Sequence, residues 1–151
     1  MHIKNFLTKA KKHSSLLGKS YKEYVQSQEA KKLKYQEWIY TYENTFYGYS
    51  PFVGQEVVWE EDKYKRAMNY YGKIVTAHID PRWIYTYLWK ALDHVDESSP
   101  FRGPEMYQED DWTYFNKTLW TMDNFEGIEK IIYKDEEVYH LSYYGGNIQS
   151  K

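Results

Sequence analysis

Two glutamates in this sequence have the residue type and surroundings for acid–base chemistry. Glu56 and Glu129 hold the same place in two similar stretches, FVGQEVVWE (52–60) and FEGIEKIIY (125–133). Alternation along a strand places each carboxyl group among apolar side chains, a setting that raises a carboxyl pKa. Two such carboxylates near a symmetry axis could exchange protons or bind a metal ion. The alternative, and the commoner role of a buried carboxylate, is to accept hydrogen bonds from backbone N–H groups or a tyrosine hydroxyl.

Three further side chains complete the candidate ligand site. Arg102, in the rigid FRGP loop, presents a planar donor suited to a carboxylate or phosphate. It could equally hold that loop to an acidic residue, as most arginine–carboxylate pairs do. Tyr70 and Tyr143 are the first tyrosines of the two Tyr-Tyr-Gly phrases. We therefore expect ligand-binding residues at Glu56, Tyr70, Arg102, Glu129 and Tyr143, in a cleft between two halves of the protein.

Metal and nucleophile signals are weak. His94 and Glu97 stand one helical turn apart, but no second matched pair accompanies them, and Asp80 is better placed to cap a helix. The absence of cysteine removes disulfides, thiolate catalysis and Cys-based zinc sites. No GxSxG, GxGxxG or Walker loop occurs either. We expect no metal and no cofactor.

Composition predicts one compact domain. Charged residues make up 28% of the 151 residues and aromatic residues 20%, so the core must be bulky and rich in tyrosine hydroxyls. A net charge of −2 gives no global attraction for nucleic acid or an anionic membrane. Neither an apolar leader nor an 18-residue apolar run is present, so a cytoplasmic location is expected.

The strongest pattern is an internal similarity. At an offset of 73 residues, seven of the 24 positions from 52 to 75 are identical, against about two expected by chance. We call positions at this offset equivalent. The identical pairs are Phe52/Phe125, Gly54/Gly127, Glu56/Glu129, Asp62/Asp135, Tyr70/Tyr143, Tyr71/Tyr144 and Gly72/Gly145. This pattern predicts an α+β fold, a duplicated antiparallel three-stranded β-meander with an N-terminal helix and one helix between the repeats.

The glycines in this pattern have separate interpretations. Gly54 and Gly127 fall inside strands, where a glycine indicates a bulge or a close approach, and we expect an aromatic ring across each. Gly72 and Gly145 follow two tyrosines, and we expect them to end strands with positive φ.

The predicted elements divide the single domain, 1–151, into four parts. An apolar stripe at Ile3, Phe6, Leu7 and Ala10 predicts a helix over 2–13, followed by a loop to residue 34. The remaining lysines of this helix, Lys11 among them, could contact a phosphate group, but a solvent-exposed face is the expectation. The first repeat spans 35–75, the linking helix 81–95 and the second repeat 111–148, with Asp80 and Pro81 starting the helix.

Three phrases carry a resemblance to a known family: ENTFYGYSPFVGQEVVW, AMNYYGKI, and FRGP followed by DWTYFN and VYHLSYYGGNI. Residues 36–148 resemble a bacterial domain family of unknown function, found alone or behind an Xre-type helix-turn-helix in predicted transcriptional regulators. The segment EEDKYKRA is more charged than the family pattern. The resemblance implies sensing or interaction and no known reaction. The residues before the first strand are too few for a complete helix-turn-helix.

Three functions remain open. The leading hypothesis is a non-enzymatic domain that binds a small molecule or a protein, with a regulatory role. The second is an enzyme that uses the Glu56/Glu129 pair for acid–base chemistry, which requires the two carboxylates to be close together. The third is a homodimeric interaction scaffold whose aromatic patches form the interface. Membrane and nucleic-acid partners are not expected.

Overall fold

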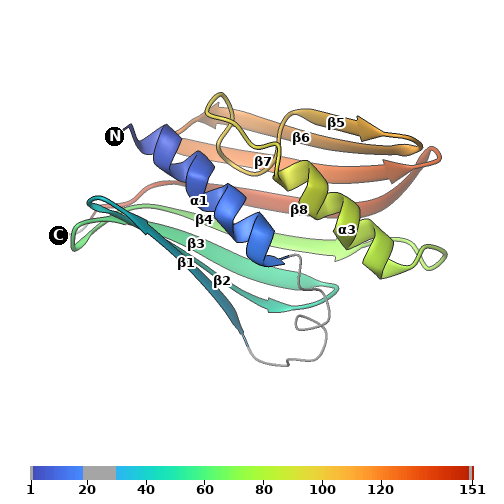
Figure 1. Cartoon of the computed structure of the whole chain (residues 1–151), viewed down its shortest axis with the longest axis horizontal. Coiled ribbons are helices and arrows are strands. Elements are labelled where there is room, and N and C mark those ends of the chain that lie inside the picture. Colours follow the sequence, from blue (N-terminus) through green and yellow to red (C-terminus); the bar gives the residue numbers. More distant parts are fainter. Residues whose placement is uncertain (1, 19–29, 150) are drawn as a thin grey trace.

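One antiparallel sheet dominates the computed structural model, which describes residues 2–18, 30–149 and 151 (Figure 1). In the described residues the sheet has eight strands in the order β1-β2-β3-β4-β8-β7-β6-β5. Two helices lie on one of its faces. The strands are β1 (Lys31–Glu37), β2 (Tyr40–Gly48), β3 (Phe52–Glu60), β4 (Lys63–Ile74), β5 (Met106–Glu109), β6 (Trp112–Thr121), β7 (Asn124–Tyr133) and β8 (Glu136–Asn147), and the helices are α1 (Ile3–Gly18) and α3 (Pro81–Leu92).

The expected α+β fold of duplicated three-stranded meanders is wrong. The protein is nearly all sheet, and four strands on either side of the β4–β8 junction form one continuous layer. The first repeat, 35–75, was predicted to hold three strands, but it runs from within β1 to the end of β4, and a turn at residues 38–39 separates β1 from β2. Trp38 has a φ of 58° there, and an aromatic residue gives no turn signal in a sequence. The short β5 follows a loop rich in proline and glycine, where no strand was expected.

Strands β3 and β4 pair in the same register as β7 and β8. Gly54 lies opposite Tyr70, and Gly127 lies opposite Tyr143. A Cβ atom at either glycine would lie 2.2 Å from the Cζ atom of the facing tyrosine, so both rings cross the space of a missing side chain. The close approach expected at these two glycines is confirmed.

The interpretation of the other two glycines was wrong. Gly72 lies within β4, and Gly145 lies within β8. Gly48 is the glycine with positive φ in the described chain. At Gly72 a Cβ atom would lie 2.6 Å from Cζ of Phe52. The glycine therefore leaves room for the Phe52 ring and does not end the strand.

The helix α3 starts as the sequence predicted. The Asp80 carboxylate accepts a hydrogen bond from the backbone N–H of Arg82 at 2.9 Å, and Pro81 occupies the first turn. The helix ends at Leu92, three residues before the expected end. The helix α1 continues to Gly18, beyond the predicted end at residue 13, and β1 begins inside the predicted loop. The rest of that loop, 19–29, lies outside the described residues.

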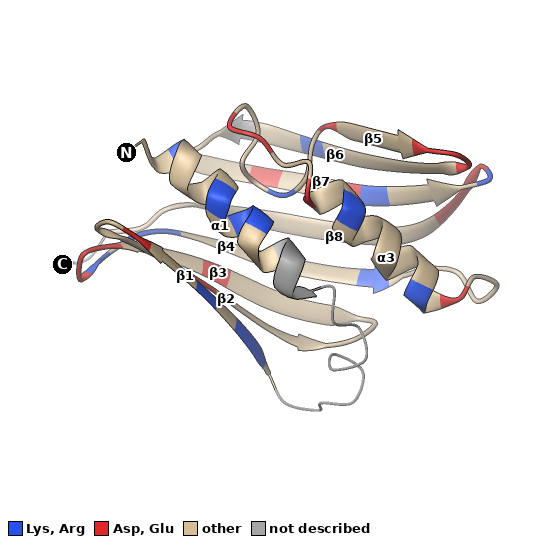
Figure 2. Cartoon of the chain, viewed as in Figure 1, with Lys and Arg blue, Asp and Glu red and all other residues tan. Residues whose placement is uncertain are grey.

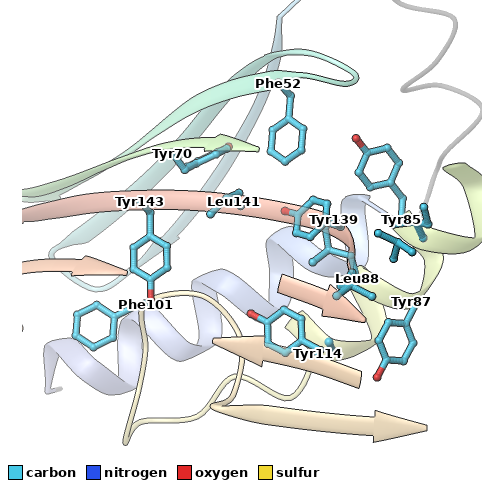
Figure 3. Close-up of a cluster of buried hydrophobic side chains, with 14 of the residues drawn as sticks. Phe52, Tyr70, Tyr85, Tyr87, Leu88, Phe101, Tyr114, Tyr139, Leu141 and Tyr143 are labelled. Atoms are coloured by element: carbon cyan, nitrogen blue, oxygen red, sulfur yellow. The ribbon is translucent and has the colours of Figure 1, made fainter. Parts of the chain in front are cut away.

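Two apolar clusters lie between the helices and the sheet. The larger one, beneath α3, is dominated by buried aromatic rings from the central strands and from α3 itself (Figure 3). The smaller one joins α1 to the β1–β4 half. Its buried members are Phe6, Leu7, Ala10, Tyr42 and Val58. Each helix is therefore held by its own set of side chains.

The opposite face of the sheet carries exposed aromatic and aliphatic side chains. Neither described helix lies on it (Figure 1). Tyr47, Val53 and Tyr71 are paired neighbours on successive strands of this face, and Tyr144 and Ile128 are also exposed there. Acidic residues concentrate instead in the hairpin turns at the ends of the sheet (Figure 2).

The ring-over-glycine packing yields a first prediction. The substitution Gly127→Ala should lower the free energy of unfolding by about 1–3 kcal/mol, because the new methyl group overlaps a buried Tyr143 ring. Urea unfolding monitored by circular dichroism measures this change. Ser142→Ala, on the exposed face of the neighbouring strand, is the control and should change stability by less than about 0.5 kcal/mol.

A double variant tests the cause. If the ring is responsible, Gly127→Ala combined with Tyr143→Leu should cost less than the sum of the single changes by about 1 kcal/mol or more. Additive effects would contradict the overlap.

Candidate functional site

The five predicted site residues lie on the helix-covered face but do not form one cluster. Tyr70 and Tyr143 are paired across the central β4–β8 junction. Arg102 lies over the Tyr70 ring, 5.2 Å from its centroid, and pairs with Glu129. Glu56 lies apart from these four, on β3.

The two glutamates do not form a pair. By register, Glu56 is level with Met68 on β4, Gly145 on β8 and Phe125 on β7. Three strand spacings and four residues separate it from Glu129, which amounts to about 14 Å across the strands and about 13 Å along them. An acid–base dyad of these carboxylates, the second hypothesis from the sequence, is therefore not formed.

Glu129 is fully buried and saturated with donors. Its side chain has 0% exposure, and Arg102 binds both of its oxygens, Nη2 to Oε1 at 2.9 Å and Nε to Oε2 at 3.2 Å. Tyr114 donates to Oε2 at 2.5 Å, and Tyr139 donates to Oε1 at 2.9 Å. The alternative interpretation of Arg102, as a residue that holds its loop to an acidic group, is confirmed.

Burial and this carboxylate set the pKa values of the donors. Burial and then the Glu129 charge raise the pKa of Tyr114 and of Tyr139 well above the ordinary value of a tyrosine. Burial by itself would lower the pKa of Arg102, but the attraction of Glu129 outweighs it and the net shift is upward. All three donors therefore keep their protons at physiological pH.

A second layer of hydrogen bonds fixes the Arg102 loop to the sheet. Tyr114 Oη accepts from the Gly103 N–H at 3.0 Å, and Asn116 Nδ2 donates to the Gly103 carbonyl at 2.9 Å. Tyr143 donates to Asn116 Oδ1 at 2.6 Å and lies 2.5 Å from the Thr118 hydroxyl. The predicted site residue Tyr143 thus belongs to the support of this loop.

A similar arrangement surrounds Glu56. Asn44 is paired opposite Glu56 as Asn116 is opposite Glu129, and Tyr70 donates to Asn44 Oδ1 at 2.6 Å. The cation differs, because it comes from helix α1. Lys11 donates to Glu56 Oε2 at 2.6 Å and to the Phe101 carbonyl at 2.5 Å.

The position of Lys11 corrects the prediction that it faces solvent. Its side chain is 8% exposed, and the Lys11–Glu56 bridge is one of two buried ion pairs between described residues, with Arg102–Glu129. Burial lowers the pKa of Lys11, and the nearby Arg102 and Arg66 charges add to this, although Glu56 acts in the opposite direction. Helix periodicity could not separate Lys11 from the exposed lysines beside it.

The two arrangements differ most at equivalent positions 66 and 139. Tyr139 donates directly to Glu129, whereas Arg66 forms no ion pair with any described carboxylate. The Arg66 side chain is nevertheless only 6% exposed; Nη1 lies 4.0 Å from the Met122 sulfur and the guanidinium lies 5.3 Å from the Phe125 centroid. Burial lowers the pKa of Arg66, despite opposing contributions from Glu56 and Asp123.

Arg66, Lys11 and Glu56 line a recess beneath α1. Its walls are completed by apolar side chains, and the space holds about one water molecule. The other lining residues are Leu7, Val58, Ala67, Met68, Pro100, Phe101 and Phe125. Neither Lys11 nor Arg66 was among the predicted site residues, although the sequence places Arg66 and Tyr139 at equivalent positions with different chemistry.

Within the described residues, no group of three or more His, Asp or Glu side chains could hold a metal ion. His94 stacks on Tyr107 with 4.4 Å between ring centroids, and its Nδ1 lies 2.8 Å from the Lys90 carbonyl. Glu97 accepts a hydrogen bond from Asn5. Neither helix in the described part of the chain combines the length and apolarity needed to cross a membrane.

The fold and the site define a tyrosine-rich sheet domain with two buried carboxylate centres. Residues 44–148 match the family model for a domain of unknown function, DUF5680, and the chain belongs to that family. The matched range covers β3 to β8 and both glutamates, while α1 and β1 precede it. Searches of curated proteins and of solved structures found no match.

The Arg102–Glu129 pair gives a second prediction. Arg102→Met should lower the free energy of unfolding by about 3–5 kcal/mol, because it leaves the fully buried carboxylate without its cation. Arg82→Met is the matched control, since Arg82 bridges Asp80 at the surface with 67% of its side chain exposed. That change should cost less than about 1 kcal/mol. Equal losses in chemical denaturation would contradict the assigned role of Arg102.

A third prediction concerns high pH. Burial has the largest effect on the Tyr143 hydroxyl and raises its pKa from 10.0 to about 12. The unfolded chain then loses this proton before the folded chain does, so stability is complete below pH 10 and declines as pH rises towards 12. Tyr143→Phe lacks the ionisable group, so the stability gap between the two proteins should narrow by about 2 kcal/mol over this range. Denaturation curves at several pH values measure the gap, and a constant gap would contradict the assignment.

Proposed function

We propose that this chain is a non-enzymatic binding domain that takes the compact polar end of a small molecule in the recess beneath α1. The observation that carries the proposal is the buried guanidinium of Arg66, which lines this space without a carboxylate partner among the described residues. Convergent polar groups in a concave, mostly apolar setting are the usual mark of a small-molecule site.

The Glu129 centre supports a different role. Both Glu129 oxygens already accept two hydrogen bonds each, and the Arg102 fork is occupied by the carboxylate. A ligand there would have to break a complete network, so this centre serves stability. Of the five residues expected from the sequence, Glu56 is the one that lines the recess.

The position of α1 supports a role in regulation. Leu7 and Lys11 of this helix form part of the recess, so a ligand there contacts α1 as well as the sheet. Occupancy would change how firmly the helix is held. The resemblance to bacterial domains that accompany Xre-type helix-turn-helix modules supports the same role, with α1 as the element that responds. A homodimeric scaffold, the third hypothesis, would use the uncovered sheet face and stays a prediction.

A blocking substitution tests the binding site. Leu7→Phe should abolish the thermal shifts that small metabolites induce in the wild-type protein, because the larger ring fills the recess while all its charged groups remain. Ile128→Phe, on the exposed face of β7, is the matched control and should respond as the wild type does. A metabolite library screened by differential scanning fluorimetry provides the measurement.

Two results would contradict the proposal. One is a screen without any stabilising compound. The other is a set of compounds that stabilise wild type and Leu7→Phe equally, which would place binding elsewhere.

A further inference from the structure

Resting on this proposed function, we propose that the ligand is a compact anion, or the anionic head of a larger molecule, held between Arg66 and Lys11. The recess then acts as an anion site that the Glu129 half of the protein lacks. Charge, donor geometry and size each point to this class of ligand.

The charges around the two glutamates are unequal. Glu129 faces one cation, Arg102, and neutral hydroxyl groups. Glu56 faces two cations, Lys11 by a direct bridge and Arg66 across the recess. One buried positive charge is therefore left over on the Glu56 side, and an uncompensated buried charge is costly.

The nearby acidic groups do not neutralise this charge by contact. Glu56 is already bridged by Lys11. Asp123, in the β6–β7 turn, attracts Arg66 but is exposed and forms no ion pair with it. Arg102, also near the site, adds positive potential at Lys11. An anion in the recess would balance the charges.

Contacts with the described residues use only some of the donors of both cations. A lysine ammonium has three N–H donors, and the two acceptors bound to Lys11 are Glu56 and the Phe101 carbonyl. A guanidinium has five N–H donors in a fixed fork that suits an oxyanion. Arg66 directs one of them to a sulfur atom 4.0 Å away, which is a weak acceptor. Both side chains can therefore donate to a ligand in the recess.

The dimensions select a small ligand. The space holds about one water molecule, and Leu7, Pro100 and Phe101 form apolar walls. A halide ion, or one oxygen of a carboxylate whose remaining atoms stay at the mouth of the recess, matches these limits better than a hydrated polyvalent ion, whose dehydration costs more. A single bridging water between Arg66 and Glu56 would also fit, and the test must separate the two.

The experiment measures melting temperature at constant ionic strength, with the potassium salt of a bulky sulfonate replaced stepwise by chloride, formate, acetate or phosphate. We expect at least one compact anion to raise the melting temperature by about 3–6 °C at tenfold its Kd. A larger rise with chloride or formate than with acetate indicates a free small anion. A larger rise with acetate indicates the head of a metabolite.

Three variants assign the effect to Arg66. Arg66→Gln should abolish the shift, and Arg82→Gln, which removes an exposed arginine, should leave it unchanged. Arg66→Tyr copies the equivalent Tyr139, which donates directly to its glutamate, so this variant should fold without an anion and show no anion response. It keeps the test valid if Arg66→Gln does not fold.

The outcomes separate this inference from the proposed function. Neutral compounds that bind in a Leu7-dependent manner, with no anion response, would overturn the anion site and leave the binding domain standing. Anion shifts that persist in the Arg66 variants would also overturn it. Absence of both anion and metabolite binding would overturn both proposals and leave a bridging water as the occupant.

Discussion

A carboxylate buried beneath a sheet must be supplied with donors, and much of this fold is organised by that requirement. Glu129 obtains them from a loop arginine and from tyrosines on β6 and β8. The bond between Arg102 and Glu129 fixes the loop after α3 against the sheet. Glu56 obtains its cation from α1, so the same requirement fixes the N-terminal helix. Removing one partner of such a pair costs far more than the pair itself contributes, which makes both connections sensitive to substitution.

The high tyrosine content follows from the same constraint. A tyrosine fills as much of a core as a phenylalanine while its hydroxyl reaches a buried acceptor. Tyr114, Tyr139 and Tyr143 each do both, and all three are buried. The glycines opposite Tyr70 and Tyr143 complement these rings, since each ring occupies the space that a side chain at the glycine would fill. Bulky residues and glycines therefore occur together because each requires the other.

The sequence predicted local features better than the overall layout. The start of α3 at Asp80 and the rings across Gly54 and Gly127 follow from local chemistry, and these predictions are confirmed. The predicted number of strands was wrong, because neither the turn at Trp38 nor the four-residue strand β5 has a distinctive residue pattern.

Partners in the site were harder to foresee than its carboxylates. Strand alternation predicts that Glu56 and Glu129 lie on the apolar face of their strands, and the burial of both residues confirms this. Their cations come from elements distant in sequence, across 45 residues for Lys11 and 27 for Arg102. The spacing of apolar residues predicts which face of a helix is buried. It does not predict which lysine beside that face turns inward to pair with a charge on another element.

The difference between Arg66 and Tyr139 marks the point at which the proposed binding function would enter this framework. At equivalent positions with similar surroundings, a neutral donor completes one network, and a cation leaves the other with an excess charge. The framework tolerates this because neither Glu129 nor its donors line the recess, although Met68, Phe101 and Phe125 of the main core do. One half can then carry stability while the other retains an incompletely satisfied buried cation. A fold that needed both centres to be complete could not have kept Arg66, on β4 beneath α1, without an ion pair to a described carboxylate.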